Sequence, residues 1–198
     1  MNGGAVMLAG WRDPVHDSQA AFRAILAAFS EPGTIVTLPV AVAGPMPLDP
    51  ATNTVLLALA DYETPLWLCP QADTAAVQAY LRFHSGCPLT RAASEAAFAL
   101  VCVAQGLTDL AHYAQGSMDY PDRSTTLLVQ VPSLVDGPPR LLTGPGIATT
   151  RMLQVAGLPL DFTVLWQRNG ARFPMGVDLI FCCGDQLACL PRTTRIDA

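Results

Sequence analysis

The sequence predicts an α/β fold, a three-layer sandwich in which helices cover both faces of a mixed sheet. Apolar runs of strand length alternate with stretches of helical periodicity along most of the chain, and the chain ends in a hairpin. Neither an internal repeat nor a low-complexity segment marks a boundary. Because 198 residues suit one domain, we expect residues 1–198 to form a single unit.

The first helix is expected to begin at Asp17, which can cap it, and to end at residues 31–33. Apolar residues recur along it at helical spacing, which predicts one buried stripe. The stripe consists of Phe22, Ile25, Leu26 and Phe29. The elements expected next are a strand over residues 34–40, a helix over 52–60, a strand over 65–69 and a helix over 73–84 that Asp73 caps.

The second half of the chain predicts further strands and helices. Prolines and glycines over residues 132–139 indicate an exposed connection. The elements around it are a strand over residues 98–104, a helix over 107–114, strands over 125–131 and 140–143, and a helix over 161–167.

The segment over residues 173–197 predicts the final hairpin. Residues 177–183 are apolar on both faces, as expected for a strand buried between two layers. Gly184 and Asp185 form a two-residue loop, and this loop length pairs Cys183 with Gln186 and Ile180 with Cys189. The same register brings Pro191 into the returning strand near its end. Since proline lacks an amide hydrogen, we expect that strand at the edge of the sheet.

Asp178 is the one acid on this apolar strand. Its carboxylate either accepts hydrogen bonds from the backbone of the turn over residues 174–176 or points into a functional site. We favour the turn. The regular register places Arg192 opposite Val177, so a pair between Asp178 and Arg192 would require Pro191 to interrupt the ladder.

The composition limits the partners that this chain can have. Only 14% of residues are charged and 51% are hydrophobic, which predicts a stable protein interface and a homodimer when the chain is alone. The net charge of −5 argues against nonspecific binding to nucleic acid. The longest apolar run has nine residues, and Met1–Ala9 lacks a basic start, so we expect a cytoplasmic protein that does not enter a membrane.

The chemistry-bearing residues form no catalytic pattern. Six cysteines lack a CxxC pair, three histidines lack metal-ligand spacing, and no GxSxG motif is present. All 11 basic residues are arginine, and the absence of lysine excludes both an internal aldimine with pyridoxal phosphate and the lysine of a P-loop. We therefore expect no catalytic residue, metal or cofactor in this chain.

Seven residues are candidates for contacts with a ligand or a partner. Glycines in a loop can expose amides to an anion, and arginine matches phosphate or carboxylate in two hydrogen bonds. For each residue a plain alternative stays open: an ordinary turn, a structural histidine at a helix end, or a solvated charge. The candidates are Arg23, Arg82, His84, Gly144, Gly146, Asp178 and Arg192.

Five blocks of the chain resemble the H subunit of the bacterial carbon-phosphorus lyase system. They occur in the family's order at compatible spacing over nearly the whole chain. The blocks are AFSEPG (28–33), TPLWL (64–68), LRFHSGCPL (81–89), LLTGPGI (141–147) and the segment 173–197.

This resemblance implies a subunit of a transferase complex in organic phosphonate catabolism. The complex would join methylphosphonate to the ribose triphosphate of ATP, displacing adenine and forming alpha-D-ribose 1-methylphosphonate 5-triphosphate. The resemblance places the nucleosidase chemistry on a different core subunit. We then expect this chain to dock that subunit and to support assembly, and not to act as an enzyme alone.

The resemblance also implies a fold like the large domain of pyridoxal-phosphate-dependent transferases, here without the cofactor lysine. Two other functions stay open. The chain could be a stand-alone binding protein or enzyme for a small phosphorylated ligand, which would use the loop over residues 144–147, Asp178 and some arginines. It could also be a degenerate relative that holds pyridoxal phosphate noncovalently.

Overall fold

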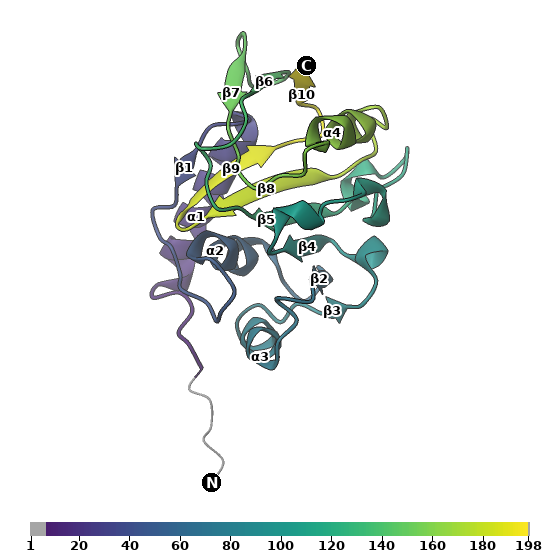
Figure 1. The fold of residues 1–198 in the computed structure, drawn as a ribbon. Coiled ribbons are helices and arrows are strands. Elements are labelled where there is room, and N and C mark those ends of the chain that lie inside the picture. The colour runs from purple at the N-terminus through teal and green to yellow at the C-terminus, as the bar shows by residue number, and fades with distance from the viewer. Residues whose placement is uncertain (1–6, 198) are drawn as a thin grey trace.

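A mixed sheet of seven strands forms the centre of the protein (Figure 1). The computed structural model describes residues 7–197, so six residues of Met1–Ala9 lie outside the described residues. Five adjacent strands of the sheet are parallel to one another, and the remaining two, β9 and β1, are each antiparallel to the strand next to them. The strand order is β1 (Val36–Thr37), β9 (Gln186–Leu190), β8 (Asp178–Cys183), β5 (Thr126–Gln130), β4 (Phe98–Val101), β2 (Leu66–Leu68) and β3 (Leu89–Thr90). The predicted α/β class with a mixed sheet is confirmed.

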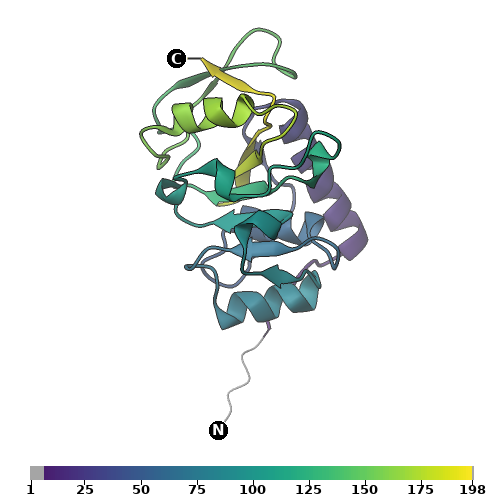
Figure 2. The same cartoon turned by 90° about the vertical axis from the view of Figure 1, so that its right-hand side faces the viewer.

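Each face of the sheet has its own hydrophobic core. Helices α1 (Pro14–Ser30), α2 (Pro50–Leu59) and α3 (Ala75–His84) pack on one face, and α4 (Phe162–Gly170) packs on the other. Figure 2 shows α3 and α4 at opposite ends of the molecule. Along β8, Ile180 and Cys182 enter the first core and Leu179 and Phe181 enter the second, which confirms a strand buried on both faces.

A second, three-stranded antiparallel sheet lies beside α4 (Figure 1). Its order is β10 (Arg195–Asp197), β6 (Arg140–Thr143) and β7 (Arg151–Leu153). Leu142, Leu153 and Ile196 contribute one side chain from each strand to the core beneath α4. Only β6 was predicted, because β7 and β10 are too short to show a period.

The helix expected over residues 107–114 is wrong. This region contains one 3₁₀ turn, η3 (Leu110–His112), and another, η2 (Ala104–Gly106), comes directly before it. The Asp109 carboxylate accepts a hydrogen bond from the amide of Ala111 at 2.9 Å and so starts a new turn inside the predicted helix. Two further 3₁₀ turns are η1 (Ala93–Glu95) and η4 (Pro121–Arg123).

The start of α1 also differs from the prediction. The N-cap is Asp13, whose carboxylate accepts hydrogen bonds from the amides of Val15 and His16. Asp17 lies in the first turn and accepts hydrogen bonds from the amides of Arg12 and Asp13. Both acids therefore stabilise the helix start, with Asp17 reaching back as in a capping box. At α3 the cap is likewise Thr74 and not Asp73.

The predicted apolar stripe of α1 is wrong at two of its four positions. Phe22 and Leu26 are 48% and 57% exposed, whereas Ala21, Ile25 and Ala28 are buried. Alanines let α1 approach α2 and β9 closely, so the face with small side chains is the one that packs. Phe22 and Leu26 are left on the outer surface, whereas Ile25 is buried and Phe29 packs against the core.

The final hairpin has the predicted register but not the predicted position. Cys183 pairs with Gln186 and Ile180 with Cys189, as expected from the loop at Gly184. The returning strand β9 is not the edge, because Val36 and Thr37 pair outside it. The strand expected over residues 34–40 shrinks to these two residues. No helix within residues 7–197 is long and apolar enough to cross a membrane.

Candidate functional site

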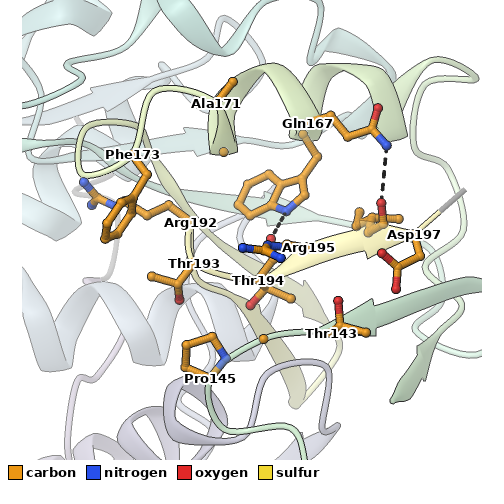
Figure 3. Close-up of a pocket in the computed structure, with 14 residues that line it drawn as sticks. Thr143, Pro145, Gln167, Ala171, Phe173, Arg192, Thr193, Thr194, Arg195 and Asp197 are labelled. Carbon is orange, nitrogen blue, oxygen red and sulfur yellow. Dashed lines mark hydrogen bonds between the residues drawn. The ribbon is translucent and has the colours of Figure 1, made fainter. Parts of the chain in front are cut away.

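One cavity, here called the larger cavity, lies between α4, β10 and the end of β6 (Figure 3). Its volume is about 780 Å³. Trp166 and Ala171 line it from α4 and the turn that follows, and Thr143 and Pro145 line it from β6 and its loop. Two of the predicted contact residues, Gly144 and Arg192, belong to the same wall. We therefore take this cavity as the candidate functional site.

Two side chains of α4 hold β10 in place at this cavity. The indole nitrogen of Trp166 donates a hydrogen bond to the carbonyl of Thr194 at 2.8 Å, and the Gln167 amide donates one to the carbonyl of Ile196 at 3.4 Å. Trp166 is 1% exposed, so its buried N–H has the partner that burial requires. These bonds make the back of the cavity a fixed surface.

Arg192 lines the cavity, but its side chain forms its hydrogen bonds inside the protein. Its backbone amide donates to Asp178 Oδ1 at 2.7 Å and its Nε donates to the same oxygen at 3.1 Å. One terminal nitrogen donates to the carbonyls of Pro121 and Pro174, and the other contacts the Ser124 hydroxyl and Asp178 Oδ2. The five N–H groups of the guanidinium therefore all have protein partners.

Arg192 therefore has no guanidinium N–H group left to bind a ligand. The Arg192 and Asp178 side chains are only 12% and 19% exposed, and together they tie the start of β8 to the loops at Pro121 and Pro174. The pair is possible because the ladder between β8 and β9 ends at Leu190, so Pro191 does interrupt the regular pairing. The geometry gives both residues a structural role.

The assignment of Asp178 to the turn over residues 174–176 is therefore wrong. Asn169 holds that turn: its side chain accepts a hydrogen bond from the amide of Val177 and donates one to the same residue's carbonyl, each at 2.9 Å. Asn169 is 3% exposed. The sequence signal for it was the Asn169–Gly170 pair at a helix end, where a polar side chain inside the last turn must find backbone partners.

The two candidate glycines are required by close packing. Gly144 and Gly146 have φ angles of 134° and 80°, which side chains other than glycine rarely adopt. A Cβ atom on Gly146 would lie 2.1 Å from the carbonyl oxygen of Ser30, and one on Gly144 would lie 2.9 Å from that of Thr193. This loop therefore has the properties of a tight turn, closed by a hydrogen bond from the amide of Ile147 to the carbonyl of Gly144.

The remaining three candidates lie away from this cavity. His84 contacts the carbonyl of Leu8 through Nε2 at 2.9 Å and packs on the ring of Tyr80, so it holds the chain that enters α1. Arg23 is exposed on α1 and lines neither this cavity nor the one beside α3. Arg82 lines a second, smaller cavity beside α3.

Two polar side chains at the larger cavity are accessible to a ligand, and a third is buried. The Thr194 hydroxyl is buried and has no hydrogen-bond partner among the described residues, and Thr193 and Arg195 are exposed at the cavity wall. Phe173, which is 63% exposed, supplies an apolar rim. These groups suit a bound peptide segment or small molecule. Asp197 adds a carboxylate to the lining, and among the described residues no hydrogen bond joins it to Thr193 or Thr194.

Among the cysteines of residues 7–197, Cys69 has a lowered pKa. Cys69 and Cys102 follow β2 and β4 at the carboxyl edge of the parallel strands, and the amide of Cys102 contacts the Cys69 sulfur at 3.3 Å. Hydrogen bonds from the Cys102 thiol and from nearby amides lower the pKa of Cys69 to about 6. The two cysteines are far apart in the sequence, so no spacing could have predicted this pair. Among residues 7–197, no group of three or more histidine, cysteine or acidic side chains could hold a metal ion.

Comparison with known proteins places nearly the whole chain in one family. The family described as bacterial phosphonate metabolism protein (PhnH) matches residues 9–197. The chain is 38% identical over 185 residues to "Alpha-D-ribose 1-methylphosphonate 5-triphosphate synthase subunit PhnH" of Rhizobium meliloti (strain 1021), covering 93% of this chain and 92% of that protein. It is 33% identical over 192 residues to "Putative C-P lyase subunit protein HtxG" of Stutzerimonas stutzeri, covering 94% and 88%. The resemblance expected from the sequence is thus confirmed.

Proposed function

We propose, from the premise that the chain belongs to the family of bacterial phosphonate metabolism proteins (PhnH), that it is a subunit of the carbon-phosphorus lyase core complex. In that complex it supports the formation of alpha-D-ribose 1-methylphosphonate 5-triphosphate. The observation that carries the proposal is the similarity to the Rhizobium meliloti synthase subunit, which extends over 93% of this chain and 92% of that protein.

The role that fits the geometry is assembly of the complex. At the larger cavity the Arg192 guanidinium has no donor left for a substrate, and among the described residues no hydrogen bond joins a threonine hydroxyl to the Asp197 carboxylate. The cavity has apolar walls at Trp166 and Phe173 and a buried hydroxyl at Thr194. We propose that a segment of the nucleosidase subunit docks here, with the rim aromatic ring as an anchor.

The docking proposal is tested by substitution at the rim of the cavity. Phe173→Glu places a charge where an apolar contact is proposed. Tyr62→Glu is the control, because Tyr62 is an exposed aromatic residue (75%, against 63% for Phe173) and lies outside this cavity. Co-expression with the nucleosidase subunit and affinity capture should recover that subunit with wild type and Tyr62→Glu, and much less with Phe173→Glu. Equal recovery with both variants would move the interface elsewhere.

The subunit role is tested by reconstitution. Adenine release from ATP and methylphosphonate should require this chain together with the other core subunits. Neither this chain alone nor the other subunits alone should release adenine. Release by the isolated chain would favour a stand-alone enzyme, and full activity of the partners without it would remove its proposed role.

We also propose that the chain forms a homodimer when it is alone. The support is the exposed apolar stripe of α1, in which Val15, Phe22 and Leu26 are 73%, 48% and 57% exposed. Light scattering on the purified chain should give twice the chain mass of 21.0 kDa. A soluble monomer at high protein concentration would count against this interface.

The proposed architecture is that of the large domain of pyridoxal-phosphate-dependent transferases. It is supported by parallel strands in a mixed sheet with helices on both faces. The likeness would be one of fold only, because the chain has no lysine to bind the cofactor covalently.

A further inference from the structure

A second cavity, here called the smaller cavity, lies between α3 and the edge strand β3. Its volume is about 370 Å³. Trp67 and Thr90 reach it from β2 and β3, and Asp73 from the segment between β2 and α3. The cavity is therefore next to the carboxyl ends of two parallel strands.

The strand order places this cavity beside a reversal of winding. The chain goes from β2 through α3 to β3 on one side, returns to β4 on the other side of β2, and then continues away to β5. The winding thus reverses between β2 and β4, where ligands commonly bind in open α/β sheets. The smaller cavity lies one strand away from that point, between β2, β3 and α3.

Two arginines line this cavity with free donors. Arg82 comes from the last turn of α3 and Arg91 follows β3, and both are exposed. Within residues 7–197 neither guanidinium donates a hydrogen bond to the protein or forms an ion pair, in contrast to Arg192. Two guanidinium groups on one cavity match the oxygens of a phosphate or phosphonate, which accept paired N–H bonds.

A carboxylate in the same cavity has a different use. Gln78 donates a hydrogen bond to Asp73 Oδ1 at 2.6 Å and so orients the carboxylate. Its second oxygen has no donor among the described residues and can accept a hydrogen bond from a hydroxyl group. In dinucleotide-binding α/β folds a carboxylate accepts a hydrogen bond from a ribose hydroxyl in the same way.

We propose that this cavity binds a phosphorylated sugar. Arg82 and Arg91 hold the phosphate or phosphonate group, and Asp73 accepts a hydrogen bond from a sugar hydroxyl. The volume of about 370 Å³ is within the range of small-ligand pockets. The choice of a ribose phosphate rests on the proposed function, while the anion site itself rests on the two free arginines.

Calorimetric titration of the intact chain tests the site. The probes are ribose 5-phosphate, inorganic phosphate and ribose, each at the same ionic strength, and the variants are Arg82→Gln, Arg91→Gln and Asp73→Asn. The matched control is Arg23→Gln, because Arg23 is exposed on α1 and lines neither cavity. Melting temperatures establish that each variant is folded.

Wild type and Arg23→Gln should bind ribose 5-phosphate more tightly than inorganic phosphate, and ribose should give no measurable heat. Each arginine variant should weaken ribose 5-phosphate about tenfold or more, the size of one lost charged hydrogen bond. Asp73→Asn should reduce the preference for ribose 5-phosphate over phosphate. Absence of binding to wild type, or binding that both arginine variants leave unchanged, would overturn the proposal.

The two proposals fail separately. If wild type does not bind any probe but the reconstituted complex needs the chain for adenine release, the anion site is wrong and the subunit role stands. If the arginine variants weaken ribose 5-phosphate while the partners release adenine without the chain, the subunit role is wrong and the site stands.

Discussion

Replacement of Arg192 by alanine should destabilise the protein more than any other single arginine substitution. The change removes five guanidinium hydrogen bonds and leaves the Asp178 carboxylate, only 19% exposed, without its cation. Loss of one partner from a buried ion pair costs about 3–5 kcal/mol. Because water still reaches part of this pair, we expect about 3 kcal/mol in the free energy of unfolding.

For a chain of this length, each kcal/mol shifts the melting temperature by about 2–4 °C, so Arg192→Ala should lower it by roughly 6–12 °C. Differential scanning calorimetry measures the shift. Arg192→Lys keeps the charge but has three donors in place of five, and should fall between wild type and Arg192→Ala. Arg172→Ala is the control, because Arg172 is exposed and donates one hydrogen bond, to Gln115.

A double-mutant cycle isolates the pair itself. Asp178→Ala alone should also lower the melting temperature, because it leaves the Arg192 guanidinium with unpaired donors. The double variant should cost less than the sum of the two single variants, since no unpaired charge is left in the site. A fall below about 2 °C for Arg192→Ala, the size of an ordinary surface substitution, would refute the structural role.

Three further predictions follow from single contacts. Asn169→Ala should reduce the free energy of unfolding by about 1–3 kcal/mol, because two buried hydrogen bonds are lost, and urea unfolding measures it; an unchanged urea midpoint would contradict this. Alkylation of Cys69 by iodoacetamide should rise through a midpoint near pH 6, since its thiolate forms above that pH, while Cys102, whose pKa the neighbouring thiol raises, should react only in more alkaline solution; a Cys69 midpoint near 9 would contradict this. Gly146→Ala should lower the melting temperature, because the φ angle is 80° and the new Cβ would lie 2.1 Å from the Ser30 carbonyl oxygen; a melt like that of wild type would show that the loop relaxes freely.

The predictable parts of the fold are those fixed by local chemistry. The loop at Gly184 sets the register of the final hairpin, and the all-apolar run of β8 places it between two layers. Strands of two or three residues, such as β3, β7 and β10, show no period, so only their distant partners define them. The outward face of α1 was mispredicted because hydrophobicity favoured Phe22 and Leu26, whereas close packing favoured the alanine face.

The candidate site was only partly predictable for a related reason. The sequence placed Asp178 and Arg192 near one another, but whether they meet depends on the residue at which the ladder between β8 and β9 stops. That end is set by Pro191 together with the loops that supply carbonyls to the guanidinium. Asn169, and not Asp178, holds the turn over residues 174–176, because a side chain near the end of α4 reaches the backbone of Val177.

All 11 basic residues of this chain are arginine. An arginine whose N–H groups all bond to the protein has a structural role, whereas an arginine with unused N–H groups can bind a ligand. Arg192 lines the larger cavity yet has no donor left, so the free charges of that cavity are Arg195 and Asp197, which offset each other. A cavity with balanced charge and an aromatic rim is suited to a protein segment.

The smaller cavity has the opposite balance, because two unused guanidinium groups face one carboxylate. That excess of positive charge favours a small oxyanion over an apolar segment. The protein can thus present one surface to a partner subunit and another to a phosphorylated ligand. Substitutions at Phe173 should therefore change assembly without changing ribose 5-phosphate binding, and substitutions at Arg82 or Arg91 should do the reverse.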